Sequence, residues 1–328
     1  MLTDEVVKEP VRTRPRRVWR RRLATAVAVL FAAGTAVRVG GLESGVLLVP
    51  LVSFTPYFGV AALLVLGVAA LVRSRAAVAV MLAVCVCLAW LVLPRVLAGG
   101  TDAATGRPLR VLTANLNGGR GDARTIVDLV RTLNVDVLSL QELTWSERDR
   151  LAAAGLETLL PYQVTKPETW GPVGSGVYAR HPLRERTGVF QPVGHHMPVV
   201  EAALPGGAVE VVVVHPVAPV PSTVPEWEAG VGTLPPAPST GAPRVLAGDF
   251  NATLDHAVFR RLLGTGYTDA AAATGKGLVP TWPMRRFPPL VAIDHVLTDG
   301  RARAVDVRIL DLPGSDHRAL FADLRVQG

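Results

Sequence analysis

The sequence predicts a chain of two parts: an α-helical membrane segment, followed by a head of the α/β class built on mixed β-sheets. From Leu23 to about Leu97 the chain is almost wholly apolar, whereas residues 98–328 carry 22 basic and 23 acidic side chains. In the second part, strand-like runs outnumber helical ones and helices fall between only some strand pairs. This order favours mixed sheets over a purely parallel, doubly wound sheet.

The positive charge of the chain is concentrated at its N-terminus. Residues 1–22 form a tail with eight basic side chains and three acidic ones. The overall net charge of +7 therefore belongs to the tail and the flanks of the apolar segment, while the head is nearly neutral. A high isoelectric point often indicates a nucleic-acid partner, but here the charge is not on the part that would bind one.

Residues 23–97 contain three apolar stretches that approach the roughly 20 residues needed to cross a bilayer. They cover residues 23–37 with an extension to 41, residues 56–72 and residues 76–93. Three spans place the basic tail and the Arg73–Arg75 turn on one side, which the positive-inside rule assigns to the cytoplasm. We expect a multi-pass protein of the cell membrane with a cytoplasmic N-terminus and an extracytoplasmic head.

Two alternatives to this topology have specific weaknesses. Two spans would place the tail and the head on the same side and leave one apolar run unexplained. A cleaved signal peptide would fit the first stretch, but two more apolar runs follow it. The two cysteines, Cys85 and Cys87, both lie in the third stretch, about 200° apart on a helix. We therefore expect neither a disulfide nor a metal site from them.

Residues 98–107 are small, polar and glycine-bearing, which predicts a short flexible linker before the head at 108–328. Within the head a helix is expected over 122–133, and Ser146 is expected to cap a second one. The proline-rich segment 216–243 is predicted to be a long loop near the site, with a helical turn around Glu226. Strands are expected at 109–114, 135–140, 177–179, 199–204, 209–214, 245–247, 293–297, 305–309 and 319–324.

Five strand-like runs end in a carboxylate, a carboxamide or an imidazole, which indicates one converging active site. The residues are Asn115, Glu142, Asp249 with Asn251, Asp294 and His317. A divalent hard cation acting on a phosphate ester is the chemistry that uses such a set most easily. Glu142 follows a run that looks buried, so its carboxylate needs a charge partner, and a divalent cation would supply one.

The other members of the set are given roles by their chemistry. Asp249 can orient or deprotonate an attacking water, and Asn251 can donate to a phosphoryl oxygen. Asp294 and His317 form a predicted dyad in which the carboxylate fixes the imidazole tautomer and raises its pKa. His215, which ends a valine run, is a second candidate as general acid or phosphate donor. His195, His196, His256 and His295 are expected at the surface or in supporting positions, and His181 is assigned no role.

From about residue 108 to 326 the head resembles the endonuclease/exonuclease/phosphatase superfamily. The motifs that carry the resemblance, in order, are Thr-Ala-Asn115, Leu-Gln-Glu142, Gly174-Ser-Gly-Val-Tyr-Ala-Arg180, His215, Gly-Asp249-Phe-Asn251, Ile-Asp294-His and Gly-Ser-Asp316-His317. The resemblance implies a four-layered α/β sandwich with two central sheets and the site at one rim. It also implies Mg²⁺ or Mn²⁺ on Glu142, with Asn115 and Asp316 nearby, and His317 as the central catalytic imidazole. Asn117 and Arg180 are the candidate substrate-binding residues.

The sequence therefore predicts a membrane-anchored, metal-dependent phosphoesterase. Its expected partners are the lipid bilayer and a phosphate-ester substrate, either nucleic acid or a phospholipid head group, and no obligate protein partner is evident. Fold alone does not choose between these substrates. The alternative is a catalytically silent head that serves as an extracellular binding module, against which the completeness of the residue set argues.

Overall fold

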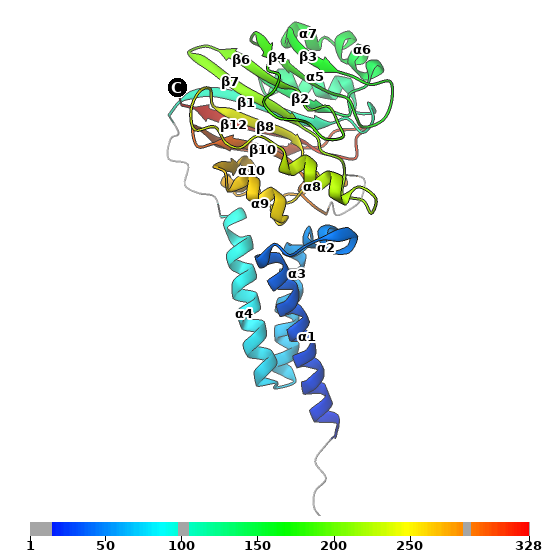
Figure 1. Ribbon diagram of the computed structural model, residues 1–328, viewed down its shortest axis with the longest axis vertical. Coiled ribbons are helices and arrows are strands. Elements are labelled where there is room, and N and C mark those ends of the chain that lie inside the picture. Colours follow the sequence, from blue (N-terminus) through cyan, green and yellow to red (C-terminus); the bar gives the residue numbers. More distant parts are fainter. Residues whose placement is uncertain (1–14, 98–104, 285–289, 328) are drawn as a thin grey trace, which may run out of the picture.

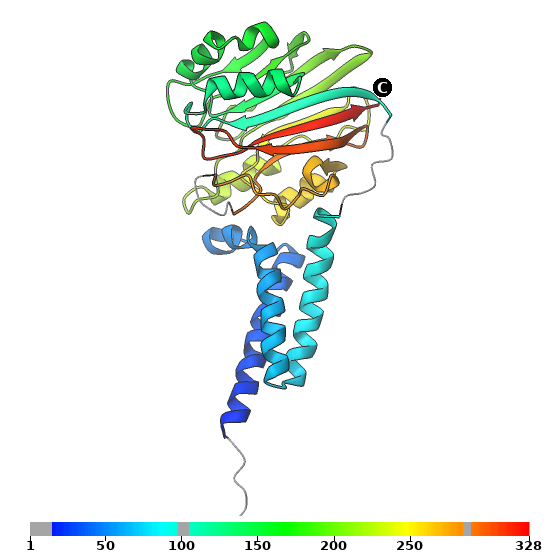
Figure 2. The same ribbon diagram turned by 180° about the vertical axis from the view of Figure 1, so that it is seen from behind.

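The computed structural model describes residues 15–97, 105–284 and 290–327 (Figures 1 and 2). Most of the predicted basic tail and of the predicted linker lies outside these residues. The described chain forms a bundle of helices with a head at one end, and α2 lies between the two (Figure 1).

The three apolar stretches are confirmed as helices. They form α1 (Pro15–Gly40), α3 (Thr55–Leu71) and α4 (Arg75–Val92), and a short helix, α2 (Gly45–Val52), precedes α3. By length and composition α1 and α4 could each cross a membrane, and α2 with α3 counts as a third span if this pair, bent by 79°, is taken as one. A short 3₁₀ turn, η1 (Leu93–Arg95), ends the segment.

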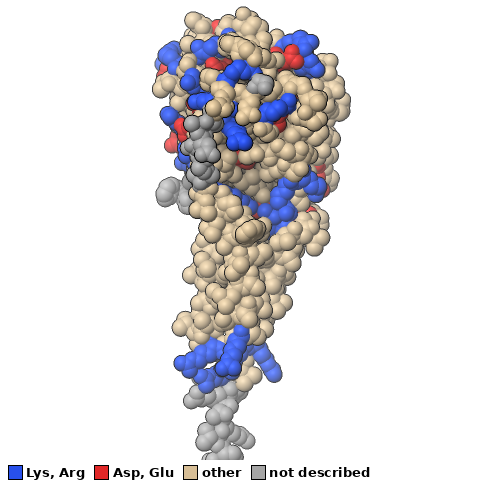
Figure 3. All heavy atoms as spheres, turned by 90° about the vertical axis from the view of Figure 1, so that its left-hand side faces the viewer, with Lys and Arg blue, Asp and Glu red and all other residues tan. Residues whose placement is uncertain are grey.

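The helices of the bundle approach closely because small residues lie where they meet. Ala28, Ala62, Ala69 and Ala77 are buried between α1, α3 and α4, and small side chains allow close backbone contact in apolar bundles. At the end of the bundle away from the head, Thr25 lies beside Ser74. Figure 3 shows basic side chains gathered at that end, where α1 begins and α3 turns into α4.

Two six-stranded mixed sheets form the centre of the head. Their strand orders are β11-β12-β1-β2-β4-β3 and β5-β6-β7-β8-β10-β9. The pairs β1–β2 and β7–β8 are parallel and the other pairs are antiparallel. The strands are β1 (Arg107–Asn115), β2 (Val137–Gln141), β3 (Tyr162–Lys166), β4 (Ser175–Ala179), β5 (Leu183–Glu185), β6 (Val199–Leu204), β7 (Gly207–Val214), β8 (Arg244–Asp249), β9 (Tyr267–Asp269), β10 (Asp294–Asp299), β11 (Ala302–Leu310) and β12 (Ala319–Val326).

The sheets pack face to face because side chains alternate along each strand. Val111 of β1 faces the core between the sheets, whereas Leu112 faces the helices on the other side. The outer face of the first sheet is covered by α5 (Ala123–Thr132), α6 (Trp145–Ala153) and α7 (Leu156–Leu159). The second is covered by α8 (Val224–Gly232) and α9 (Ala257–Leu263), and α10 (Ala270–Ala273) follows β9. The predicted four-layered sandwich is confirmed.

Some local predictions need correction. Helix α6 is capped by Thr144, whose side chain accepts from the Glu147 amide, and Ser146 lies inside the first turn. The helical turn predicted around Glu226 within segment 216–243 is confirmed, but it is longer than one turn, because α8 spans Val224–Gly232 and buries Trp227 in the core. The short strands β3, β5 and β9 were not expected. They are edge strands of three to five residues, too short to show a clear pattern.

Candidate active site

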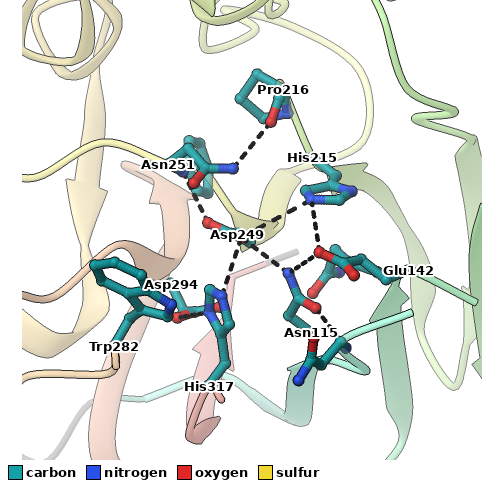
Figure 4. A network of polar contacts seen from close by, with 12 residues as sticks. Asn115, Glu142, His215, Pro216, Asp249, Asn251, Trp282, Asp294 and His317 are labelled. Carbon is teal, nitrogen blue, oxygen red and sulfur yellow. Dashed lines mark hydrogen bonds and ion pairs between the residues drawn. The ribbon is translucent and has the colours of Figure 1, made fainter. Parts of the chain in front are cut away.

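The topology brings the predicted strand ends to one edge of the head (Figure 4). Because β1 and β2 are parallel, Asn115 and Gln141 are paired and Glu142 follows directly. In the other sheet β10 runs antiparallel to β8, so Asp294 at its start pairs with Asp249 at the end of β8. His317 precedes β12, which is antiparallel to β1, and so lies at the same edge.

Asn115 connects the two sheets. Its Nδ2 donates to Glu142 Oε1 at 3.1 Å and to Asp249 Oδ2 at 3.0 Å, while its Oδ1 accepts from the Asn117 amide at 2.9 Å. The side chain is almost completely buried. A single carboxamide thus holds two carboxylates from different sheets close together, an arrangement that no local pattern specifies.

Three site positions adopt a left-handed backbone although none is glycine. The φ angles are 50° at Asn117, 58° at Glu142 and 49° at Asn251. Asparagine tolerates this region, but a glutamate there costs on the order of 1 kcal/mol. Such strain persists where the surrounding structure over-determines it, which occurs mostly at functional sites. At Glu142 the turn directs the carboxylate toward Asn115 and the Gly118 amide, which donates to Oε2 at 2.6 Å.

His317 is held in a buried dyad with Asp294. Its Nδ1 lies 2.9 Å from Asp294 Oδ2, and its amide donates to Ser315 Oγ at 2.9 Å. Burial alone would lower the pKa of His317, but the charges of Asp294 and Asp249 raise it to about 10. The raised pKa favours the protonated imidazole, whose Nε2 faces Asp249.

Asp249 is the neighbour of this dyad. Its Oδ2 lies 3.7 Å from His317 Nε2, and its Oδ1 accepts from the Asn251 amide at 2.8 Å. Burial raises the pKa of Asp249 to about 7, against the opposing effect of the His317 charge. A carboxyl group with such a pKa is close to the value that suits proton transfer to or from water near neutrality.

His215 is a neutral imidazole. Its Nε2 lies 3.9 Å from both Glu142 Oε1 and Asp249 Oδ2. Burial lowers its pKa well below the usual value, and the charges of His195 and His317 lower it further. A neutral imidazole carries one N–H group and one bare nitrogen, so His215 can donate one hydrogen bond and accept another. The His195 ring packs on it with centroids 4.4 Å apart, in the supporting role expected for that residue.

The site has more negative charge than the described protein neutralises. Among the residues that the structure describes, the ion pairs of Glu142, Asp249 and Asp294 involve only His215 and His317. Asp294 Oδ1 is also buried without a hydrogen-bond partner. Buried carboxylates in this state need a cation, so the donor set fits a hard divalent metal.

Two groups of side chains qualify as metal ligands. Asp249, Asp294 and His317 offer ligand atoms that lie within 4.8 Å of one another. The predicted group consists of Glu142, Asn115 and Asp316; Asn115 bonds Glu142, and Asp316 Oδ2 accepts from the Trp282 indole at 3.1 Å. Asp294 and His317 already bind each other. A cation is therefore expected on the other side of the site, near Glu142 and Asp249.

The substrate-binding candidates are placed differently from each other. Asn117 lies at the site, where its carbonyl and Oδ1 accept from the Arg120 guanidinium. Arg180 contacts Asn134 and Asp136 beside the start of β2, whereas Glu142 follows its end. A strand of five residues spans roughly 16 Å, so Arg180 does not share the site. The glycine-containing motif locates β4 correctly, but its last residue points to the opposite edge.

Of the remaining polar residues that the sequence singles out, some contact residues of the site and others form hydrogen bonds away from it. Asn251 Nδ2 donates to the Pro216 carbonyl at 3.1 Å, which joins the start of the proline-rich segment to the site. His256 and His295 are buried and not at the surface; His295 pairs with Asp269 at 2.9 Å. His196 pairs with Glu168 at 3.1 Å.

Sequence reasoning missed two contributors, Ser315 and Trp282. Ser315 Oγ donates to the Asn115 carbonyl at 2.7 Å and accepts from the His317 amide, so it fixes one strand end against another. It stands inside the Gly-Ser-Asp-His motif, which was the available signal. Trp282 donates to Asp316 beside His317, and no motif marked it (Figure 4).

Comparison with known proteins agrees with this geometry. The pattern of the Endonuclease/Exonuclease/phosphatase family matches residues 112–317, more than half of the chain. An endonuclease/exonuclease/phosphatase structure from Beutenbergia cavernae has a TM-score of 0.52 at 20% identity, with 68% of this chain and 72% of that one covered. No curated protein matches the chain.

Two further structures share the fold at lower identity. A humanized D. rerio TDP2 has a TM-score of 0.51 at 15% identity, covering 67% of this chain and 99% of that one. A truncated Caenorhabditis elegans TDP2 has a TM-score of 0.51 at 15% identity, covering 68% and 99%. At these identities the likeness concerns the fold alone.

Proposed function

Because the chain belongs to the endonuclease/exonuclease/phosphatase family, we propose that it is a divalent-metal-dependent phosphoesterase anchored in the cell membrane. The observation that carries the proposal is the convergence of Asn115, Glu142, Asp249, Asp294 and His317 at one edge of the two sheets. Their excess negative charge matches a cation, and their donors match a phosphate group.

Mg²⁺ or Mn²⁺ is the proposed cofactor, held by Glu142 and Asn115 with Asp249 beside them. Asp316 is assigned a lesser part, because its carboxylate is bound to Trp282. When bound, the cation would supply polarisation of a phosphoryl oxygen and a lower pKa for a bound water. To bind the ion, the Asn115 amide would have to turn its oxygen toward it and give up the hydrogen bonds from Nδ2 to Glu142 and Asp249.

The side chains of the site have separate roles in hydrolysis of the phosphate ester. Asp249 orients the attacking water and accepts its proton through Oδ2, which faces His317 Nε2. His317, kept protonated by Asp294, donates to the charge that develops on a phosphoryl oxygen. Neutral His215 donates beside it. Asn251 retains one amide hydrogen for the same purpose, since the other bonds Pro216.

The topology that we propose places the head outside the cytoplasm. Basic side chains gather at the end of the bundle away from the head (Figure 3), and the positive-inside rule assigns that end to the cytoplasm. With α1, α3 and α4 as spans, the head follows α4 on the opposite side. The substrate is a phosphate ester accessible there, either nucleic acid or a lipid head group.

The test is hydrolysis of a soluble bis-aryl phosphodiester by the full chain in detergent. We expect turnover with Mg²⁺ or Mn²⁺ and none after chelation. Asp249→Asn and His317→Ala should each lower the rate by about a hundredfold or more. Asp128→Asn and His181→Ala are matched controls outside the site and should keep normal rates.

Wild-type silence from a folded, metal-binding chain would contradict the proposal and favour a binding role for the head. A rate that does not depend on metal would also contradict it. Equal rates in Asp249→Asn and wild type would show that the assigned site is wrong.

A further inference from the structure

The head is clamped to the helical bundle through one buried carboxylate. Asp255 Oδ1 accepts from Arg38 Nε at 2.7 Å and from Arg95 Nη2 at 2.6 Å, and its Oδ2 accepts from Arg95 Nη1 at 2.7 Å. All three side chains are buried. Arg38 belongs to the end of α1 and Arg95 to the turn after α4, so two helices hold one loop of the head.

Other contacts extend this junction. The His256 imidazole bonds the Val49 carbonyl of α2 at 3.0 Å, and Glu43 accepts from the Ala257 amide at the start of α9. Tyr57 of α3 donates to the Leu290 carbonyl at 2.8 Å. Val49 is completely buried in the same apolar cluster as Trp227 and Phe250 of the head. The head is therefore seated on the bundle and not merely tethered to it.

The head segments that contact the bundle lie close in sequence to residues of the candidate site. Asp255 follows Asn251 by four residues, and Leu290 precedes Asp294 by four residues. Four residues reach at most about 14 Å even when fully extended. The polar head-group layer of a bilayer is itself roughly 5–8 Å deep on each side. The residues of the catalytic edge therefore lie no more than about 14 Å from the contacts between head and bundle.

Helix α2 presents an apolar face that the head does not cover. Leu47 is 79% exposed and Leu51 63% exposed, whereas Val49 is turned into the head. The helix is bent by 79° from α3, so it lies across the end of the bundle beneath α8 (Figures 1 and 2). An apolar helix lying across the ends of membrane spans fits the boundary between head groups and acyl chains.

A cavity beneath α2 continues this apolar surface. It has a volume of about 340 Å³ and is lined mainly by apolar side chains of α1, α2 and α3. Leu48 and Leu51 of α2 form part of it, together with Phe58 of α3. Its position among the helices of the bundle, beside the exposed face of α2, suits the hydrocarbon chain of a lipid.

From these observations we infer that the substrate is a phosphate ester carried by a lipid of the leaflet on the side of the head. The inference rests on the proposed function and names its substrate class. The Asp255 clamp fixes the distance between the catalytic edge and the bilayer, and α2 lies in the lipid interface. The lipid can then enter the site with its head group while its acyl chains stay in the bilayer. The nearly neutral net charge of the head agrees with this class better than with nucleic acid, whose binding depends on neutralising many phosphates.

The experiment uses the full chain reconstituted in phosphatidylcholine vesicles with Mg²⁺ or Mn²⁺. The lipid probes are phosphatidylglycerol, phosphatidylethanolamine and phosphatidylinositol in the same bilayer. A soluble bis-aryl phosphodiester and single- and double-stranded DNA and RNA oligonucleotides are offered in parallel. We expect metal-dependent hydrolysis of at least one bilayer lipid, faster than that of its short-chain soluble analogue and of the oligonucleotides.

Variants of the exposed face of α2 test the lipid substrate independently of the phosphoesterase activity. Leu47→Glu and Leu51→Glu should each lower hydrolysis of the bilayer lipid by about tenfold or more, because a carboxylate resists the lipid interface. Both should leave hydrolysis of the soluble diester unchanged. Tyr162→Glu, which places a carboxylate on an exposed strand of the head, is the matched control and should change neither rate.

Three results would overturn the inference. One is hydrolysis of the soluble diester without hydrolysis of any bilayer lipid. This result would still support the proposed phosphoesterase activity. Another is preferred hydrolysis of an oligonucleotide, which would assign the site to nucleic acid. The third is equal loss of lipid and soluble-diester hydrolysis in the α2 variants. Silence on every probe would remove the proposed function itself.

Discussion

At the scale of the residue, the clearest functional mark is the backbone of Glu142. A glutamate at φ 58° is strained, and its carboxylate sits among other acids without a lysine or arginine partner in the described structure. Both features cost stability. Natural proteins accept such costs where activity requires them, so removing the side chain should separate stability from function.

Glu142→Asn should stabilise the metal-free chain by about 1 kcal/mol, since asparagine tolerates the left-handed region and removes a negative charge. The same change should abolish metal-dependent hydrolysis. Thermal unfolding in chelator and the rate with Mg²⁺ are the two measurements. A chain that is destabilised yet fully active would contradict both parts of the argument.

At the scale of the element, the loop between β8 and α9 has two tasks. It begins with Asp249 and Asn251, to which we assign catalytic roles, and ends with Asp255 and His256, which bind the helical bundle. Any movement of the head on the bundle is therefore transmitted to the site within a few residues. The loop is expected to be one of the most protected parts of the head.

Asp255→Asn should destabilise the seated chain by roughly 3–5 kcal/mol, because Arg38 and Arg95 would remain buried without a full counter-charge. We expect faster amide hydrogen exchange in α9 and in the loop before it. Asp306→Asn, at a half-exposed ion pair on β11, is the matched control and should have little effect. Unchanged exchange in Asp255→Asn would show that the clamp does not hold the head.

The clamp should also open in acid. Burial favours the neutral acid, but the hydrogen bonds and charges of Arg95 and Arg38 prevail and lower the pKa of Asp255 below its usual value. A lowered pKa contributes stability above the unfolded value of about 3.9, and this stability is lost as the pH falls through the folded value. The protection of α9 amides relative to their intrinsic exchange rate at each pH should therefore fall in wild type below about pH 4, and Asp255→Asn should lack this component.

At the scale of the whole molecule, the chain combines a helical bundle, a head seated on it and a site at one edge of the two sheets of the head. A cation that binds only the folded head stabilises it by mass action, about 2.7 kcal/mol at a hundredfold excess over Kd. Mn²⁺ or Mg²⁺ should thus raise the unfolding temperature of wild type. Asp249→Asn should lose most of this shift, whereas an equal shift in both would place the cation elsewhere.

The orientation of the whole chain is tested by reporters fused after Gly328. An alkaline phosphatase fusion should be active and a fusion to a fluorescent protein that folds only in the cytoplasm should be dark. The charge at the far end of the bundle is the reason for this expectation. The opposite pair of signals would overturn the proposed topology.

The sequence by itself determined what depends on local pattern and on motif chemistry. Apolar runs located the three long helices, alternation located most strands, and the polar residues at strand ends identified the members of the site. Its errors were also local in origin. Ser146 and Thr144 are equally good caps by type, and the motif ending in Arg180 does not show which end of β4 faces the site.

Only the tertiary structure decided which distant residues meet. Asn115 bridges Glu142 and Asp249 because two sheets pack face to face, and Asp316 accepts a hydrogen bond from Trp282, which no motif marked. Arg38 reaches Asp255 across 217 positions of sequence. Contacts of this kind depend on the summed packing of whole layers, which brings residues together regardless of their spacing, so no periodicity or short motif encodes them.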